Sequence, residues 1–463
     1  MSFSIPQWPL KSAFKSGLGL TIALILSGCA TLKVTKTPKT ARNIILFIGD
    51  GMGISTITAA RIFDGQSRGL KGEENILAFE DFEHIALIKT YNTNAQVPDS
   101  AGTATAIKSG YKTTIGTINV EADKSFQGCG DNPAPPTLTA RAKAAGKAVG
   151  IVTTTRLTHA TPAAMYGHAD SRSWESDKDM TESDEDMTEE ALAQGCKSLA
   201  AQMLLSQADL MLGGGHGKFT PAQINTLQAS HTYVTTKDEM LAAPKTGTLR
   251  GLFTKEHMAY EADRNPAIEP SLAEMTTLAI ERLSGNKEGY VLMVEAGRVD
   301  HAHHESNAYR ALTDMQALNK AVKAAKDISG EETLILVTAD HSHVFTIAGY
   351  PVRGNPILGL VRNIDPATGL PAEDYALAED GKPYTTLGYH NGPHLRHTYS
   401  PALTENGVRA KDFHQEAAIP LEAETHAGED VPLYARGPGA ERVRGVMEQE
   451  EIFRVMASAM GWE

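Results

Sequence analysis

Short apolar runs alternate with helical patterns along much of this chain. The runs are rich in β-branched residues and end in polar or glycine-rich turns. They span residues 43–49, 148–154, 208–212, 289–294 and 333–337. Helical patterns lie between several of them, at 137–145, 191–207, 271–283 and 307–328. Because short runs that are apolar on both faces fit buried parallel strands, the pattern predicts an α/β fold: a three-layer α/β/α sandwich with a mostly parallel central sheet.

The alternation fails from residue 348 to 424, where Gly, Pro, Tyr and Asn are frequent and no period holds. We expect an inserted surface module there, with 43–347 and 425–463 forming the core. The acidic segment 175–190 is expected to be a solvated loop. Apolar residues near the end fit a closing amphipathic helix; they are Val443, Val446, Met447, Phe453 and Met456.

The N-terminal residues read as a targeting segment rather than as part of the fold. Lys11 and Lys15 precede the apolar run 18–26, which is too short to span a bilayer, and small residues follow it. The sequence LSGC at 26–29 resembles a bacterial lipobox. It predicts a signal peptide at 1–28, a lipid anchor at Cys29, a tether at 29–42, and an exported lipoprotein of the cell envelope, in the periplasm or outer membrane. The alternative is an ordinary signal peptide with an incidental cysteine.

Three cysteines occur in the chain. With Cys29 assigned to lipid, Cys129 and Cys196 remain as a pair in an oxidising compartment, which favours a disulfide. The alternative is two separate buried thiols.

The net charge of the chain bears on which molecules it can bind. The formal net charge is −13, so most of the surface would repel nucleic acid, and we expect no nucleic-acid partner. An anionic substrate would need a local cluster of cations.

Three clusters of acids and histidines follow predicted strands or lie near the end of the chain. The segment 295–304 (EAGRVDHAHH) places Asp300 and His304 four residues apart, on one face of a helix. The segments 338–343 (TADHSH) and 424–430 (ETHAGED) are the other two. One further carboxylate, Asp50, follows the first run. Since ligands bind beyond the carboxyl ends of parallel strands, the clusters predict a multinuclear metal site, and imidazole with carboxylate but no thiolate fits catalytic zinc.

Paired metals about 4 Å apart clamp the attacking and leaving oxygens of an in-line displacement, which points to phosphoryl or sulfuryl transfer and requires a nucleophile. The segment 99–106 (DSAGTATA) supplies Ser100 at the start of a predicted helix, where free N–H groups attract an anion. The alternative is a plain serine N-cap. The glycine-rich segment 213–218 fails the phosphate-loop pattern at Leu212 and Phe219 and is interpreted as a tight strand exit.

Taken together, these motifs resemble the alkaline phosphatase family. They are GDGMG at 49–53, DSA at 99–101, DHAHH at 300–304, TADH at 338–341 and THAGED at 425–430. The resemblance runs from about residue 43 to the C-terminus. It is closest to the animal-type branch, on the segments TTTR at 153–156, HATP at 159–162 and GYP at 349–351.

The resemblance implies a role for each matching residue. Ser100 would be the nucleophile and Arg172 would grip two phosphate oxygens. The first zinc would be held by Asp300, His304 and His426, and the second by Asp50, Asp340 and His341. One magnesium would be held by Asp50, Thr161 and Glu295. Outer positions contacting the phosphate or the ligands would be His159, His301 and His343. The resemblance also implies the Cys129–Cys196 disulfide, a crown module at 348–424 and a homodimer.

The expected function is hydrolysis of phosphate monoesters through a phosphoserine, with two zinc ions activating the nucleophile, the water and the leaving group. Two alternatives remain. One is a phosphodiesterase or sulfatase of the same superfamily, although Ser100 does not lie in the Cys/Ser-x-Pro-x-Arg pattern of sulfatases. The other is an inactive envelope lipoprotein that only binds metal or phosphate.

Overall fold

A computed structural model describes residues 40–182, 185–396 and 402–462. The predicted signal peptide, Cys29 and most of the predicted tether lie outside these residues. The described chain belongs to one compact unit, Thr37–Glu463.

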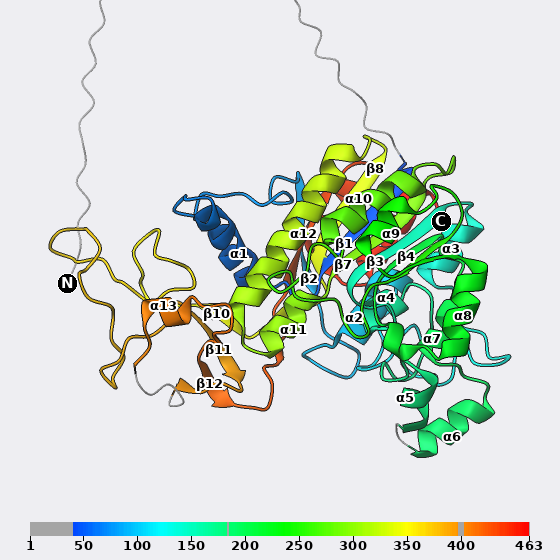
Figure 1. The fold of residues 1–463 in the computed structure, drawn as a ribbon, viewed down its shortest axis with the longest axis horizontal. Helices are drawn as coiled ribbons and strands as arrows, with labels where there is room; N and C mark the ends of the chain where they lie inside the picture. The colour runs from blue at the N-terminus through cyan, green and yellow to red at the C-terminus, as the bar shows by residue number, and fades with distance from the viewer. Residues whose placement is uncertain (1–39, 183–184, 397–401, 463) are drawn as a thin grey trace, which may run out of the picture. The chain divides into compact units, whose positions relative to one another are not determined.

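A ten-stranded sheet forms the centre of this unit (Figure 1). Its strands, in spatial order, are β15 (Gly445–Glu448), β2 (His84–Lys89), β14 (Val431–Arg436), β8 (Thr333–Ala339), β1 (Asn43–Gly49), β7 (Tyr290–Ala296), β3 (Ala148–Arg156), β4 (Leu210–Gly214), β6 (Leu249–Leu252) and β5 (Thr232–Val234). Only β14 runs against its neighbours, β8 and β2; every other pairing in the sheet is parallel. The predicted mostly parallel sheet is confirmed.

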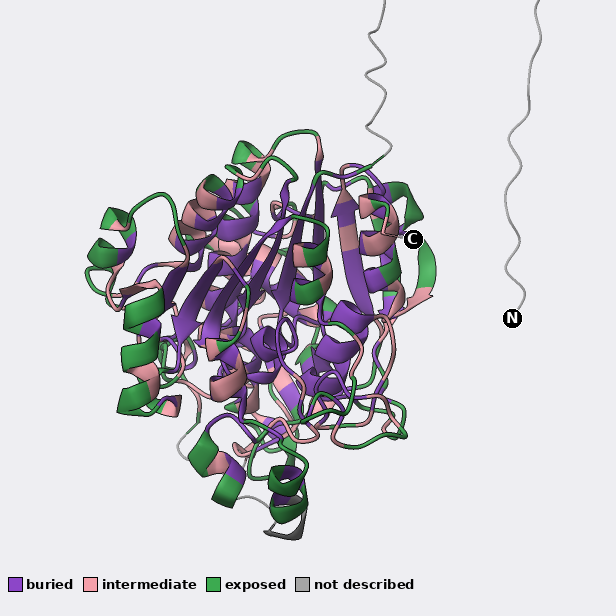
Figure 2. Ribbon diagram, turned by 90° about the vertical axis from the view of Figure 1, so that its right-hand side faces the viewer, coloured by how far each residue is buried: buried purple, intermediate pink, exposed green. Residues whose placement is uncertain are grey.

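The central strands β1, β7 and β8 are buried along their whole length, which is why they read as continuous apolar runs in the sequence (Figure 2). All five predicted strands are present, with ends that differ by up to two residues.

Helices flank the sheet in two groups that pack among themselves, and they complete the predicted three-layer α/β/α sandwich (Figure 1). One group is α1 (Ile54–Ser67), α10 (Leu272–Leu283) and α12 (Ala308–Ile328). The other is α2 (Ser100–Ser109), α4 (Ala160–Ala163) and α14 (Glu451–Met460), and α3 (Leu138–Ala144) packs on β3 and β7. Side-chain caps fix several helix starts; Ser271 forms a capping box with Glu274 at α10, and Asn307 caps α12.

The remaining helices are α5 (Asp177–Glu182), α6 (Glu185–Ala193), α7 (Leu199–Leu204), α8 (Pro221–Ser230), α9 (Lys237–Ala242), α11 (Arg298–His304) and α13 (Glu405–Val408).

Three predictions about elements differ from the structure. The acidic segment 175–190 is not a loop, because α5 and most of α6 lie in it and Met180 is buried. The closing amphipathic segment is not all helix, because Val446 and Met447 belong to the edge strand β15 and the helix α14 begins at Glu451. The predicted helix at 191–207 is likewise divided, into the end of α6 and the short α7.

The segment predicted as an insert contains little regular structure apart from α13 and two strands of a small sheet. That sheet has the order β10 (Phe345–Ile347), β11 (Leu387–Gly392) and β12 (Ala417–Pro420). The domain boundaries at 348 and 424 stay predictions.

Cys129 and Cys196 form a disulfide, as predicted, which joins segments 67 residues apart. Across residues 40–182, 185–396 and 402–462, no helix has both the length and the apolar character needed to cross a membrane.

Candidate active site

Three carboxylates gather at the carboxyl edge of the sheet because their strands are in register. Gly49 at the end of β1 lies opposite Ala296 of β7 and Ala339 of β8. Asp50 and Asp340 each follow directly, and Glu295 lies one residue before Ala296. All three acidic side chains are buried.

A glycine turn lets the chain pass between these carboxylates. Gly51 adopts a left-handed conformation with φ of 72°, and its N–H donates to Asp340 Oδ1 at 3.1 Å. A Cβ at this position would collide with the ring of His343. Gly51 of the GDGMG motif is therefore required by the packing of the site, and not by the binding of a dinucleotide.

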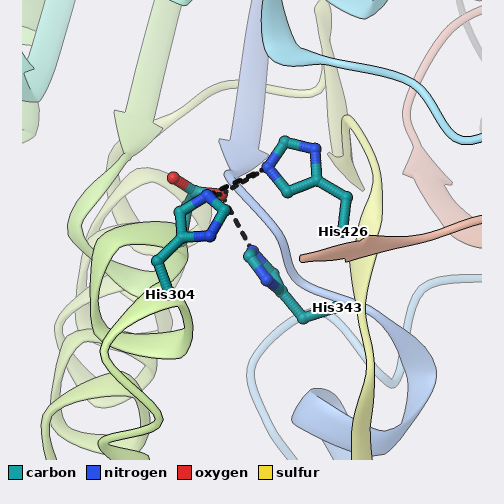
Figure 3. Close-up of side chains that lie close together, drawn as sticks. His304, His343 and His426 are labelled. Carbon is teal, nitrogen blue, oxygen red and sulfur yellow. Dashed lines mark hydrogen bonds and ion pairs between the residues drawn. The ribbon is translucent and has the colours of Figure 1, made fainter. Parts of the chain in front are cut away.

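The first cluster joins three histidines to Asp300 (Figure 3). Asp300 and His304 share one face of α11, as predicted, and two short paired strands, β9 (Ser342–His343) and β13 (His426–Ala427), bring in His343 and His426. The distances from Asp300 Oδ1 to Nε2 are 3.4 Å for His304, 2.8 Å for His343 and 3.2 Å for His426. The Nε2 atoms of His304 and His426 are 3.1 Å apart.

Backbone carbonyls orient two of these rings. His304 Nδ1 lies 2.6 Å from the carbonyl of Glu424, and His426 Nδ1 lies 2.8 Å from the carbonyl of Pro98. Each Nδ1 therefore donates its proton to a carbonyl, which leaves Nε2 as the ring nitrogen that can offer a lone pair to a metal. This is the arrangement that fixes metal-ligating histidines in proteins.

His343 is bonded differently, because both of its ring nitrogens meet carboxylates. Its Nδ1 lies 2.6 Å from Glu424 Oε2, and its Nε2 lies 2.8 Å from Asp300 Oδ1. Burial lowers the pKa of His343, but Glu424 and Asp300 outweigh burial and raise it to about 10. A ring that donates from both nitrogens has no lone pair for a metal, so in this arrangement His343 orients Asp300.

The second cluster surrounds Ser100. His341 Nε2 lies 3.1 Å from Ser100 Oγ, 3.4 Å from Asp50 Oδ1 and 3.3 Å from Asp340 Oδ2. Burial holds the pKa of His341 well below its usual range, so its ring is neutral and can offer a lone pair. Asp50, Asp300 and His341 also offer ligand atoms within 4.8 Å of one another, so the first and second clusters adjoin.

The third cluster combines Asp50 and Glu295 with His159, again with ligand atoms within 4.8 Å of one another. Within the described residues, both oxygens of Asp50, Glu295 Oε1 and Thr161 Oγ1 are buried without a hydrogen-bond partner. Buried oxygens without partners are costly unless a cation satisfies them. The oxygen donors of Asp50, Glu295 and Thr161 thus fit a hard divalent ion such as magnesium.

Ser100 is the first residue of α2 and not its cap. The cap is Asp99, whose side chain accepts from the N–H of Gly102 at 3.1 Å. The hydroxyl of Ser100 is therefore not used for capping, and it lies at the helix end that favours anions.

Arg172 is held beside this helix end. Its Nη1 lies 3.1 Å from Asp99 Oδ2, and its Nη2 lies 3.0 Å from His159 Nε2. Burial would raise the pKa of Asp99, but Arg172 and the N–H of Gly102 outweigh burial and lower it. The Arg172 side chain stays 28% exposed, so the guanidinium is anchored yet accessible to an anion.

Buried carboxyl groups lie close together in these clusters. Burial, together with the neighbouring carboxylates, raises the pKa of Asp50 well above its usual range. Burial also raises the pKa of Asp340 and of Glu295. Crowded buried carboxylates of this kind are relieved by bound cations.

His301 and His303 lie outside these three groups. His301 Nδ1 lies 2.8 Å from Nη1 of Arg298, and its ring packs 5.5 Å from that of His159. His303 is buried against the hydroxyls of Thr56 and Tyr389. It is a core residue of the motif, which the sequence did not distinguish from its neighbours.

The sequence reasoning assigned no role to two residues of the site. Glu424 is the first residue of the segment 424–430, two residues before His426, and its carboxylate bonds His343. Lys108 is fully buried on α2, and its Nζ donates to the carbonyl of Thr161 at 2.6 Å. A lysine in a helix made otherwise of uncharged and mostly small residues was the only signal for it.

A cavity of about 400 Å³ opens beside the first cluster. Its lining includes His301 and His304 together with Arg298, His394 and His414. A larger cavity of about 660 Å³ between α9 and α10 contains none of the predicted site residues.

Comparisons of the sequence and of the structure with known proteins both find alkaline phosphatases. The sequence profile of the alkaline phosphatase family matches residues 41–462. The chain is 43% identical over 459 residues to the tissue-nonspecific alkaline phosphatase of Gallus gallus, covering 90% of this chain and 84% of that protein. Identity to the Homo sapiens isozyme is 39% over 457 residues, covering 90% and 83%.

Two solved structures are similar over nearly their whole length. Thermus thermophilus alkaline phosphatase has a TM-score of 0.66 and 25% identity, covering 95% of this chain and 96% of that chain. A variant of TAB5 alkaline phosphatase with Mg bound in its M3 site has a TM-score of 0.63 and 25% identity, covering 92% and 99%.

Proposed function

The chain belongs to the alkaline phosphatase family and is a phosphomonoesterase, and we propose that it works through a covalent phosphoserine at Ser100. The observation that carries this proposal is the position of Ser100 Oγ. It lies 3.1 Å from His341 Nε2, at the start of α2, and beside buried carboxylates and imidazoles that fit divalent cations.

We propose that the resident metals are two zinc ions and one magnesium. Asp300, His304 and His426 would hold the first zinc, and Asp50, Asp340 and His341 the second. Imidazole with carboxylate supports zinc, and the oxygen donors of the third cluster support magnesium, the ion that the TAB5 variant binds in its M3 site. When bound, the zinc ions would lower the pKa of the Ser100 hydroxyl and offset the charge on the leaving oxygen.

The residues of the chain supply orientation and charge. Arg172 can bind two phosphate oxygens with its planar fork, which places phosphorus in front of Ser100 Oγ. The Ser100 hydroxyl releases its proton to solvent, the Oγ–P bond forms as the ester P–O bond breaks, and the departing alkoxide takes up a proton from solvent. Water then cleaves the Oγ–P bond, which restores the hydroxyl and releases phosphate. The cavity beside His301 and His304 would receive the leaving group.

Three substrates with the same chromophore test this proposal: p-nitrophenyl phosphate, bis(p-nitrophenyl) phosphate and p-nitrophenyl sulfate. Purified protein in zinc and magnesium should have its highest kcat/KM on the monoester. A higher value on the diester or the sulfate would overturn the assignment in favour of a phosphodiesterase or a sulfatase. If none of the three substrates is hydrolysed, the result would favour the alternative of an inactive lipoprotein that only binds metal or phosphate.

We further propose export and anchoring through a lipidated Cys29, on the strength of the lipobox-like segment 26–29. The protein should then require detergent for extraction from membranes, and Cys29→Ser should release it. Extraction of the unaltered protein by salt or buffer alone would contradict the anchor.

We also propose a homodimer. Large apolar side chains of the predicted crown module are exposed, including Tyr350 at 87%, Leu370 at 64% and Leu377 at 61%, and a second subunit would bury such residues. Analytical ultracentrifugation should give twice the chain mass, and a monomer at micromolar concentration would contradict it.

A further inference from the structure

Lys108 is a cation sealed inside the protein. It lies on α2, eight residues after Ser100, and none of its surface is exposed to solvent. In the described part of the chain its one hydrogen bond runs from Nζ to the carbonyl oxygen of Thr161, at 2.6 Å. Burial without a paired anion in contact is unusual for lysine, because an ammonium group is strongly hydrated in water.

The hydrogen bond places this ammonium beside the third cluster, because Thr161 is one of the residues whose buried oxygens would hold the magnesium ion. Burial lowers the pKa of Lys108 to about 8, while the carboxylates of Glu295, Asp340 and Asp50 act in the opposite direction. Burial raises the pKa of Glu295, and the hydrogen bond from Thr153 and the charge of Lys108 offset only part of that rise. Lys108 therefore holds the backbone of Thr161, and the hydroxyl of Thr161 is buried without a hydrogen-bond partner, as are both oxygens of Asp50 and Oε1 of Glu295.

We propose that Lys108 is a fixed counter-ion of the third metal site, which offsets part of its carboxylate charge. The inference rests on the proposed magnesium site. Two consequences follow from Coulomb's law. The ammonium weakens the binding of a divalent ion, because it repels that ion in a poorly solvated interior. It also stabilises the carboxylates when no ion is bound, so the fold depends less on magnesium. Lys108 is thus a positioning residue that acts through charge and does not contact the substrate.

Replacing Lys108 by Met tests this, since Met has a similar length, suits a buried position and carries no charge. Magnesium affinity of the zinc-loaded protein would be measured by calorimetry, and melting temperature with and without magnesium by circular dichroism. Lys108→Met should bind magnesium about tenfold tighter or more, and magnesium should raise its melting temperature further than it raises that of the unaltered protein.

Lys112→Met is the matched control. Lys112 lies four residues further along the chain, over the ring of Tyr91 and 3.5 Å from Glu448, away from the three clusters. The Lys112→Met variant should bind magnesium with the same affinity as the unaltered protein. Unchanged or weaker magnesium binding by Lys108→Met would overturn the proposal. If Lys108 were purely structural, its replacement would lower the melting temperature by the same amount with and without magnesium.

A double variant covers the case in which Lys108→Met does not fold. Lys108→Met with Glu295→Gln removes one charge of each sign, so the proposal predicts that the metal-free fold is recovered. Failure of both variants to fold in zinc and magnesium would contradict the proposal. If the unaltered protein binds no magnesium at all, the proposed third site is wrong, which is a separate outcome from unchanged affinity in Lys108→Met.

Discussion

Asp300 is oriented by two buried residues behind it, His343 and Glu424. His343 bridges the two carboxylates at 2.8 and 2.6 Å, and Glu424 also accepts from the N–H of Val344 at 2.8 Å. Groups that orient a metal ligand in this way typically contribute a factor of about 10 to 100 to metal affinity.

Glu424→Gln should therefore weaken zinc binding at the first site by roughly 10- to 100-fold, since the amide keeps the shape but loses the charge that holds His343 protonated. Titration of metal-free protein with zinc against a competing chelator measures this. Glu422→Gln is the control, because Glu422 is exposed two residues away. Equal zinc affinity in both variants would show that Glu424 has no part in the site.

The sequence predicted which residues the structure brings together, but not how each is used. Asp300 and His304 are four residues apart, so predicting a helix was enough to place them on one face. Asp50 and Asp340 each follow a predicted parallel strand, so both were expected at the same edge of the sheet. Glu424 and Lys108 could not be assigned, because their role depends on which buried atom they face across more than fifty residues of sequence. His303 looked equivalent to His304 until the face of α11 was known.

At the scale of elements, α12 carries a buried acid on the face that packs inward. Asp314 accepts from the N–H of Glu261 at 3.1 Å, and burial raises its pKa to about 8. Between the unfolded pKa near 4 and about 8, the native state binds one proton more than the unfolded state. The free energy of unfolding contributed by Asp314 therefore falls as pH rises, by about 1 kcal/mol per pH unit.

Asp314→Asn should remove that slope, because the amide can still accept the hydrogen bond but cannot ionise. Urea unfolding between about pH 5 and pH 8 should show the variant gaining stability relative to the unaltered protein as pH rises. Asp327→Asn, at an exposed position on the same helix, is the control. A constant difference across this range would contradict a buried titrating carboxyl at 314.

The disulfide links the loop before α3 to the segment between α6 and α7. Because it closes 67 residues, its loss should lower the free energy of unfolding by up to about 4 kcal/mol. Urea unfolding of a Cys129→Ala/Cys196→Ala variant measures this change. No loss of stability would mean that the bridge constrains neither the native nor the unfolded chain.

The buried strands β1, β3, β4, β7 and β8 were predictable because most of their residues are apolar, whereas β2 and β15 were not. β2 alternates exposed and buried residues over six positions, and β15 is short and mostly exposed, so neither gives a continuous run. Segment 175–190 was mistaken for a loop because its many charges hide the buried Met180 that anchors α5.

At the scale of the whole molecule, the fold brings together buried carboxylates that repel one another unless cations bind. Complete chelation should therefore abolish activity and also lower the melting temperature, and zinc with magnesium should restore both. Activity assays and thermal unfolding on the same chelated sample check this. Full activity at metal contents below one tenth of an ion per chain, measured by mass spectrometry, would contradict a metal-dependent site.

The proposed mechanism depends most on Ser100 Oγ as the atom that receives the phosphoryl group. Acid quenching of the enzyme during turnover of a phosphate monoester, followed by peptide mass spectrometry, tests it directly. We expect a phosphate on Ser100 and, in Ser100→Ala, no phosphopeptide and a loss of turnover of about a thousandfold or more with metal content retained. Phosphate on another residue, or turnover that survives in Ser100→Ala, would contradict it.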